Sequence, residues 1–179
     1  MILAGGTASR LGGVAKPQLE VGGATLLDRV VAACAGAGRI IVVGPAQPVA
    51  VEVSWAREDP PGGGPVAGLA AAAPYVMAPV VLTLAADLPG IAPAVAELLA
   101  SVPADGVAAL ATAGRTNYLA AAWRTASLRA ALAGLVPAGA SMRSLFDGVP
   151  LVAVGDTEGR GRDIDTWDDV DRARQDALN

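Results

Sequence analysis

The stretch "PVVLTLAAD" (79–87) restricts the fold more than any other part of this sequence. Its apolar residues are nearly continuous, and a carboxylate ends the run. The segment "RIIVVG" (39–44) has the same continuous apolar character. Strands of this kind are buried on both faces, as happens when helices cover both sides of a parallel sheet. We therefore expect both segments to be strands of such a sheet, with 79–87 at its centre.

Segments of strand and helix character alternate along the rest of the chain. Thr25 can cap a helix over 25–36, and Pro65 suits the first turn of a helix over 65–76. Further helices are expected over 93–102, 126–136, 141–147 and the C-terminal stretch, where Thr166 and Asp169 form a capping-box pattern. Further strands are expected over 1–4, 49–55 (at an edge), 105–112, 117–124 and 149–154. The alternation predicts one domain, spanning 1–179, with a doubly wound and mostly parallel α/β sheet.

Composition and charge narrow the class of protein. Apolar residues make up 53% of the chain and aromatic residues only 3%, so the core is expected to be mainly Ala, Val and Leu. The formal charge of -4 argues against a general binder of nucleic acid or of anionic membranes. Cys34 is the only cysteine, which rules out an internal disulfide and suggests a buried thiol. Any anionic ligand must therefore be met by local cations.

The stretch 62–86 has no charged residue and is long enough to span a membrane. It contains Pro65, Pro74 and Pro79, and most of its apolar residues are alanines. A buried helix followed by a buried strand is therefore the favoured interpretation. No signal-peptide pattern opens the sequence. These features predict a soluble, cytoplasmic protein.

The sequence contains two glycine-rich turns. The first is "LAGGTASRLGGVAKP" (3–17), which carries Arg10 and Lys16, and the second is "PPGGGPVAG" (60–68), which leads into a helix. Glycines let backbone N–H groups approach a phosphate closely, and a helix N-terminus adds a favourable dipole. The two cations would neutralise phosphate charge. The alternative for the first turn is a simple connection rich in left-handed residues.

Carboxylates stand at the same predicted edge of the sheet. Asp87 ends the central strand, and Asp163 and Asp165 precede the last helix. Ligands of open α/β sheets bind outside the carboxyl ends of the strands, and carboxylates there can hold Mg²⁺. With the glycine turns they predict a site for a nucleoside triphosphate and Mg²⁺. Alternatively, Asp87 caps the next helix and the other two complement a helix dipole.

Other motifs point away from competing chemistries. The Walker pattern is absent, and residues 62–67 fit a dinucleotide-binding pattern but follow two prolines instead of a strand. Arg57, Glu58 and Asp59 are interpreted as solvated turn residues. The chain has no histidine, which excludes histidine triads and histidine metal sites. Nucleotidyl transfer to an ionised phosphate needs no such base, because it depends mainly on positioning and charge neutralisation.

Four motifs resemble, in the same order, those of the molybdenum cofactor guanylyltransferase family. They are "LAGGTASRLGGVAK", "GGPVAG", "LAADLPGI" and "DIDTWDDV", and together they span nearly the whole chain. The resemblance implies a Rossmann-like nucleotidyltransferase fold. It also implies an enzyme that transfers GMP from Mg·GTP to the phosphate of molybdopterin-bound molybdenum and releases pyrophosphate. It also implies transient contact with other molybdenum cofactor proteins, and no partnership with nucleic acid or membrane.

The resemblance also assigns roles to individual residues. By position, Leu3, Ala4, Gly5 and Gly6 would cradle base and phosphates. Arg10 and Lys16 would neutralise the triphosphate. The wall near guanine and ribose would be Gly64, Pro65 and Gly68. Asp87 would bind Mg²⁺, and Asp165 is expected to join it as a metal ligand.

The sequence departs from the family pattern at two places. Ala15 stands where an acidic residue usually precedes the lysine, and Asp163 and Asp165 replace asparagines, as in several cytidylyl- and sugar nucleotidyltransferases. These departures leave two alternatives: a related enzyme that uses CTP or a sugar-phosphate acceptor, and a nucleotide-binding accessory protein without turnover.

Overall fold

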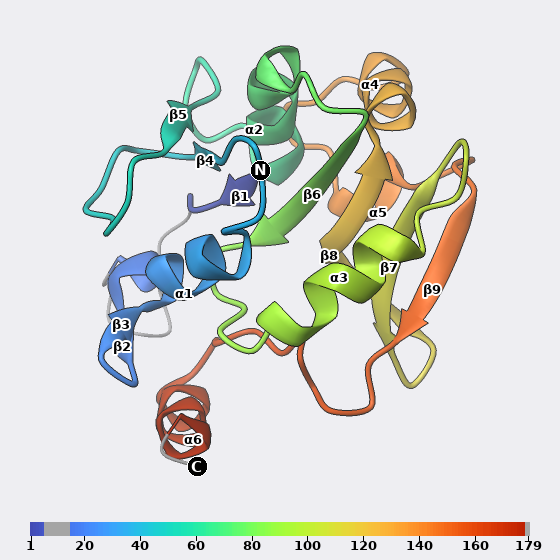
Figure 1. Cartoon of the computed structure of the whole chain (residues 1–179). Coiled ribbons are helices and arrows are strands. Elements are labelled where there is room, and N and C mark those ends of the chain that lie inside the picture. The colour runs from blue at the N-terminus through green and yellow to red at the C-terminus, as the bar shows by residue number, and fades with distance from the viewer. Residues whose placement is uncertain (6–14, 178–179) are drawn as a thin grey trace.

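The computed structural model describes residues 1–5 and 15–177. Within these residues, strands from along the whole chain form one seven-stranded sheet with the order β5-β4-β1-β6-β8-β7-β9. Figure 1 shows this sheet with helices packed on it. The strands are β1 (Ile2–Leu3), β4 (Ile41–Val43), β5 (Ser54–Ala56), β6 (Val80–Ala85), β7 (Val107–Thr112), β8 (Arg115–Arg124) and β9 (Leu151–Gly155).

The sheet is mostly parallel, as the sequence predicts. β1 pairs in parallel with both β4 and β6, β4 pairs in parallel with β5, and β7 with β9. Only β8, among the described strands of this sheet, runs antiparallel to its neighbours, β6 and β7. β6 is the central strand, and four of its six residues are buried. The expected short first strand lies directly beside it.

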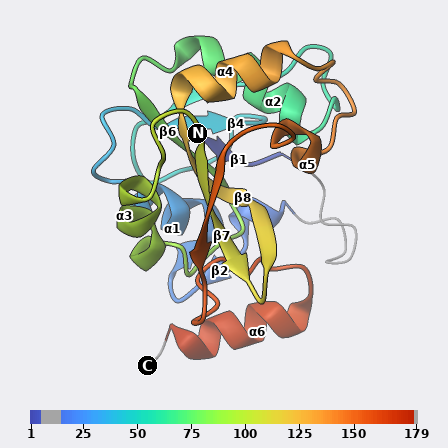
Figure 2. The same cartoon turned by 90° about the vertical axis from the view of Figure 1, so that its right-hand side faces the viewer.

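Helices cover both faces of the sheet, as Figure 2 shows nearly edge-on. One face packs against α1 (Leu26–Ala33) and α3 (Ala92–Ala100), and the buried Cys34 belongs to this core. The opposite face packs against α2 (Pro65–Ala72), α4 (Thr125–Ala133) and α5 (Met142–Leu145). The doubly wound arrangement and the buried thiol are therefore confirmed. α2 gives way to a 3-10 turn, η3 (Ala73–Tyr75), because Pro74 has no N–H to continue the helix.

Three of the six aromatic residues pack together in the core on one face of the sheet. The fully buried Trp123 on β8 packs its ring 4.5 Å from that of Phe146, and Phe146 lies 4.9 Å from Tyr118 (centroid distances). The indole N–H donates to Thr83 Oγ1 at 3.1 Å, across the β6–β8 pair. Alanines dominate this part of the sheet, which leaves room for the large ring.

The structure differs from the sequence prediction at two places. The edge strand expected over 49–55 is β5, at the edge of the sheet, but it begins only at Ser54. Residues 49–53 are not paired as a strand, and Ala50 N–H donates to Asp28 Oδ1 at 2.7 Å. A small antiparallel hairpin, β2 (Glu20–Val21) and β3 (Ala24–Thr25), was not predicted. Gly22 and Gly23 form its turn with positive φ angles, which glycine adopts without strain.

The C-terminal helix α6 (Trp167–Asp176) begins with the predicted capping box. Thr166 Oγ1 accepts from Asp169 N–H, and the Asp169 carboxylate accepts from Thr166 N–H at 2.9 Å. The helix lies beyond the carboxyl ends of the parallel strands (Figure 1). Its Val170 belongs to a small buried cluster that includes Val21 of the hairpin. Among the residues that the structure describes, no helix is long and apolar enough to cross a membrane. The prediction of a single domain over 1–179 stays a prediction.

Candidate functional site

The carboxyl end of β1 forms one border of the candidate site. Ala4 N–H donates to Val43 O at 2.8 Å, and Ala86 N–H donates to Leu3 O at 2.9 Å, so β1 joins the ends of β4 and β6. Gly44, directly after β4, lies so close to the end of β1 that a Cβ on it would stand 3.0 Å from the backbone of Ala4. The structure thus places Leu3, Ala4 and the exposed Gly5 at the strand ends. Gly6 and Arg10 lie outside the described residues.

Lys16 joins two distant carboxylates at this edge. It begins the 3-10 turn η2 (Lys16–Gln18), which is anchored by the buried Pro17. Its Nζ donates to Asp165 Oδ1 at 2.7 Å and lies 2.6 Å from Asp87 Oδ2. The Lys16 side chain is 17% exposed, that of Asp87 20% and that of Asp165 51%. Three residues that sequence analysis singled out separately therefore form one cluster.

Asp87 combines a fixed backbone with a carboxylate oxygen that is free to bind. Its carbonyl accepts from Ile164 N–H at 3.2 Å, which ties the end of β6 to the segment before α6. Its Oδ1 atom is buried and has no hydrogen-bond partner among the described residues. α3 begins at Ala92 without a side-chain cap in the described structure, so Asp87 does not serve as its cap. A buried carboxylate oxygen without a partner is costly unless a ligand completes it.

The charges in the cluster influence one another. Desolvation alone would lower the pKa of Lys16, but the hydrogen bonds and charges of Asp165 and Asp87 outweigh it and raise that pKa. Desolvation, and after it the charge of Asp165, raises the pKa of Asp163. Thr166 and Asp169 already cap α6, so the helix does not need Asp163 or Asp165 for that purpose. Among the described residues, negative charge is thus concentrated in this cluster and Lys16 compensates part of it.

The same residues fit a divalent cation. The ammonium of Lys16 shows that a cation is accommodated between Asp87 and Asp165, and Asp87 Oδ1 offers a further oxygen. Within residues 1–5 and 15–177, no group of three or more His, Cys, Asp or Glu side chains could hold a metal by itself. Mg²⁺ favours such incomplete sites, because it keeps waters and takes phosphate oxygens alongside one or two carboxylates.

The second glycine-rich turn lies on the other side of β1. Gly64 precedes α2 with φ +89°, Pro65 opens the helix, and both are exposed. Gly68 is buried, and a Cβ there would stand 2.7 Å from Val43 Cγ1 and 3.6 Å from Leu3 Cδ2. This glycine therefore allows α2 to pack closely on β1 and β4. The turn does not contact the Lys16 cluster in the described contacts; β1 separates them.

A cavity of about 490 Å³ borders the same turn. It is lined by Glu58–Gly63, by Ala67, Ala70 and Ala71 of α2 and by Pro137 and Ala138. Glu58, which was interpreted as solvated, is half-buried and its Oε1 accepts from Gly62 N–H at 3.0 Å. It thus shapes the turn, whereas Arg57 and Asp59 are exposed as expected.

Two polar residues near the site were missed from sequence. Gln47 donates to Ala4 O at 3.2 Å, and no pattern in the sequence marks it. Asp156 directly follows β9 and is 4% exposed. Like Asp87, Asp156 is a carboxylate that follows a strand of the sheet, but β9 is an edge strand with four of its five residues exposed. The position after a strand is the one signal that could have identified it.

A parallel nucleotide-binding-type sheet with cationic and anionic groups at its carboxyl edge is typical of nucleotidyltransferases. The chain belongs to the MobA-like NTP transferase family, whose domain matches residues 1–153. The resemblance found in the motifs is thereby confirmed, and with it the enzyme class.

One sequence relative and two solved structures are similar to this chain over nearly its whole length. A molybdenum cofactor guanylyltransferase from Acidiphilium cryptum (strain JF-5) is 32% identical over 188 residues, covering 97% of this chain and 92% of that protein. A nucleotidyl transferase structure from Methanothermobacter thermautotrophicus has a TM-score of 0.81 at 23% identity, covering 99% of this chain and 95% of that one. The 2-C-methyl-D-erythritol 4-phosphate cytidylyltransferase of Thermus thermophilus has a TM-score of 0.76 at 24% identity, covering 99% of this chain and 98% of that one. The two solved structures share the fold.

Proposed function

We propose that this chain transfers GMP from GTP to the phosphate of a molybdenum cofactor and releases pyrophosphate, with Mg²⁺ as the metal. The observation that carries the chemistry is the meeting of Lys16, Asp87 and Asp165 at the carboxyl end of β6. The similarity to a molybdenum cofactor guanylyltransferase along 97% of the chain supports the choice of nucleotide and acceptor.

Each group has a role in this proposal. Asp87 and Asp165 would hold Mg²⁺, which would neutralise charge on the triphosphate when bound. Lys16 would leave the carboxylates and contact phosphate oxygens, together with Arg10 and the backbone of Leu3–Gly6. The turn at Gly64, Pro65 and Gly68 would border guanine and ribose.

The bond changes are simple and need no general base. A phosphate oxygen of the acceptor is already ionised and attacks the α-phosphorus of GTP. The new P–O bond forms as the bond between the α-phosphorus and its bridging oxygen breaks, and pyrophosphate leaves with the electron pair. Lys16 would stabilise the negative charge that moves onto the leaving group, which is the type of electrostatic contribution that dominates such reactions.

The carboxylates at Asp163 and Asp165, in place of the family's usual asparagines, keep a cytidylyltransferase as the second candidate. The fold does not separate the two, because a cytidylyltransferase has nearly the same backbone. An accessory protein that binds nucleotide without turnover is distinguished by pyrophosphate release. The nucleotide and the release of pyrophosphate are therefore what must be measured.

The test compares thermal unfolding with each nucleoside triphosphate and Mg²⁺, then pyrophosphate release with molybdopterin as acceptor. A ligand at about 100 times its dissociation constant stabilises the folded state by about 2.7 kcal/mol, and we expect GTP to give the largest rise. The Asp87→Asn variant should fold and bind guanine nucleotide yet release almost no pyrophosphate, since the charge that holds the metal is lost. A larger shift with CTP would overturn the guanine assignment. Near-normal turnover by Asp87→Asn over a range of Mg²⁺ concentrations would overturn the role of Asp87.

A further inference from the structure

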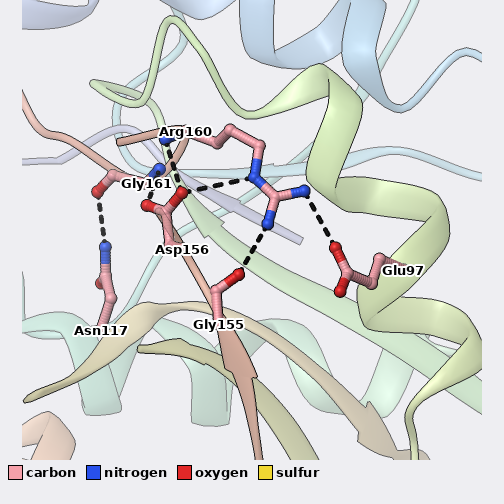
Figure 3. Close-up of polar contacts among 6 residues, drawn as sticks. All are labelled: Glu97, Asn117, Gly155, Asp156, Arg160 and Gly161. Carbon is pink, nitrogen blue, oxygen red and sulfur yellow. Dashed lines mark hydrogen bonds and ion pairs between the residues drawn. The ribbon is translucent and has the colours of Figure 1, made fainter. Parts of the chain in front are cut away.

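The segment between β9 and α6 delivers Asp165 to the site, although it contains neither helix nor strand. Asp165 is half exposed, and its backbone N–H is held within the described structure by Asp169 at 3.2 Å. A carboxylate on such a connection needs support from elsewhere if it is to stay within 2.7 Å of Lys16. The support lies upstream, in a network around Asp156 that Figure 3 shows.

Asp156 closes the first part of the segment into a tight loop. Its side chain is 1% exposed. Oδ1 accepts from Arg160 N–H at 2.9 Å, and Oδ2 accepts from Gly161 N–H at 2.9 Å. Its own N–H donates to Ala111 O at 2.9 Å, which fixes Asp156 to β7. The carboxylate thus binds two backbone groups that would otherwise be free to move relative to the sheet.

Arg160 ties the loop to its surroundings through three contacts of one guanidinium. Nε donates to Asp156 Oδ1 at 3.3 Å, Nη2 to Gly155 O at 2.8 Å and Nη1 to Glu97 Oε2 on α3 at 2.9 Å. On the other side of the loop, Asn117 of β8 donates from Nδ2 to Gly161 O at 2.8 Å (Figure 3). The loop is therefore held by β7, β8, β9 and α3 together.

The network reaches Asp87 through two backbone contacts. A Cβ on Gly90, three residues after Asp87, would stand 3.4 Å from Arg160 O, so the two loops are closely packed. Four residues after Arg160, the buried Ile164 donates its N–H to Asp87 O at 3.2 Å. The path from Asp156 to Asp165 is thus short and fixed at both ends. Neither Asp156 nor Arg160 is among the groups that contact Lys16 in the described structure.

We infer that Asp156 and Arg160 are positioning residues that hold Asp165 where it completes the metal site with Asp87. The inference rests on the proposed function, because it concerns the metal that would accompany the nucleotide. It gives a role to the buried carboxylate of Asp156, which takes no part in the proposed reaction. Residues that orient metal ligands commonly change metal affinity by about tenfold or more when they are replaced.

The test measures how strongly a divalent cation improves nucleotide binding. The dissociation constant of GTP is measured by calorimetry in EDTA and in saturating Mn²⁺, and the ratio of the two constants reports the metal site. We expect Asp156→Asn to lower this ratio by about tenfold while the constant in EDTA changes much less, because no phosphate-binding group is replaced and the Lys16–Asp165 contact is exposed and weak. A loss of stability alone would not produce that pattern.

A matched control and a second variant separate positioning from general damage. Asp28 is a carboxylate that also accepts from a backbone N–H, that of Ala50 at 2.7 Å, but it lies on α1 outside this network. Asp28→Asn should leave the ratio unchanged. If Asp156→Asn does not fold, Arg160→Lys replaces it, since lysine keeps the charge but loses the three-way guanidinium contacts.

A double-mutant cycle tests whether Asp156 affects metal binding through Asp165. Asp165→Asn should lower the ratio by itself, and adding Asp156→Asn should lower it little further, because Asp156 acts through Asp165. Additive losses, or an unchanged ratio in both Asp156→Asn and Arg160→Lys, would overturn the inference. A wild-type ratio near one would instead overturn the proposed metal site, so the two failures are distinguishable.

Discussion

Lys16 lies between Asp87 and Asp165, the two carboxylates that we propose as metal ligands, and this leads to a prediction for Lys16→Met. Without nucleotide, a divalent cation can bind both carboxylates only after the ammonium leaves. The contact with the half-exposed Asp165 contributes at most about 1 kcal/mol. The better-covered contact with Asp87, at 2.6 Å, contributes about 1.5 kcal/mol. After a discount for solvent screening, displacing the ammonium costs about 2 kcal/mol, or about thirtyfold in the metal's dissociation constant.

Methionine keeps the apolar stem of Lys16 and removes the charge. We therefore expect Lys16→Met to bind Mn²⁺ about thirtyfold more tightly than the wild type in the absence of nucleotide. The same variant should bind GTP more weakly, because a cation at the triphosphate is lost. The free Mn²⁺ signal in electron paramagnetic resonance gives the metal affinity directly.

Two features of the chain sharpen this assay. Lys16 is the only lysine in the sequence, so isotope-labelled lysine gives one side-chain signal that should shift when GTP draws the ammonium away from the carboxylates. Arg172→Met is the matched control, since it removes one positive charge from an exposed ion pair with Asp169 at 3.2 Å. It should change Mn²⁺ affinity little. An Mn²⁺ affinity of Lys16→Met within about threefold of both the wild type and this control would refute the reasoning, since the expected effect is about thirtyfold.

Two further predictions concern stability. Desolvation alone would raise the pKa of Asp156, but hydrogen bonds from the N–H groups of Gly161 and Arg160 and from the Arg160 guanidinium lower it. The contribution of Asp156 to the stability of the folded protein is therefore complete above the unfolded-state pKa of about 4. That contribution is lost as the pH falls through the pKa of Asp156 in the folded protein. In urea unfolding at successive pH values below about 5, stability should consequently fall less steeply for Asp156→Asn than for the wild type. Trp123→Phe should lower the free energy of unfolding by about 2–3 kcal/mol, because a buried hydrogen bond to Thr83 and part of the ring are lost. Adding Thr83→Val should recover part of that loss in the same denaturation assay, and a fully additive loss would contradict the role of the hydrogen bond.

Local sequence was sufficient for most of the elements. The run at 79–87 became β6, because its apolar residues can be buried on both faces wherever the strand lies in a covered sheet. The cap at Thr166 was equally clear, since a capping box involves only residues within one helical turn. The strand expected over 49–55 does lie at the edge of the sheet, as β5, but its bounds were wrong, because it covers only Ser54–Ala56. Ala50 instead donates its N–H to a distant carboxylate, that of Asp28.

The candidate site was predictable only in part. Asp87 was identified because a carboxylate after an apolar strand has a known place in α/β sheets. The assignment of Asp163 and Asp165 rested on their position before a helix, which allowed a purely local role. In the structure Thr166 and Asp169 form the cap of α6, and a contribution of Asp163 and Asp165 to the helix dipole stays an alternative. The support of Asp165 by Asp156 and Arg160 could not be predicted, because Glu97 on α3, which pairs with Arg160, and Asn117 on β8, which binds Gly161, lie far away along the chain.

The sequence by itself determined the alternating elements, the mostly parallel sheet and the family, because apolar periodicity, caps and ordered motifs are all properties of neighbouring residues. Only the tertiary structure decided that Lys16 lies between Asp87 and Asp165, the second of which is 149 residues away. It also decided that Gly68 serves the packing of α2 on β1 and β4. The physical reason is that strand order and loop closure bring these groups together. Pairing across a sheet depends on the contacts of the whole chain, whereas a strand or helix signal is carried by a few adjacent side chains.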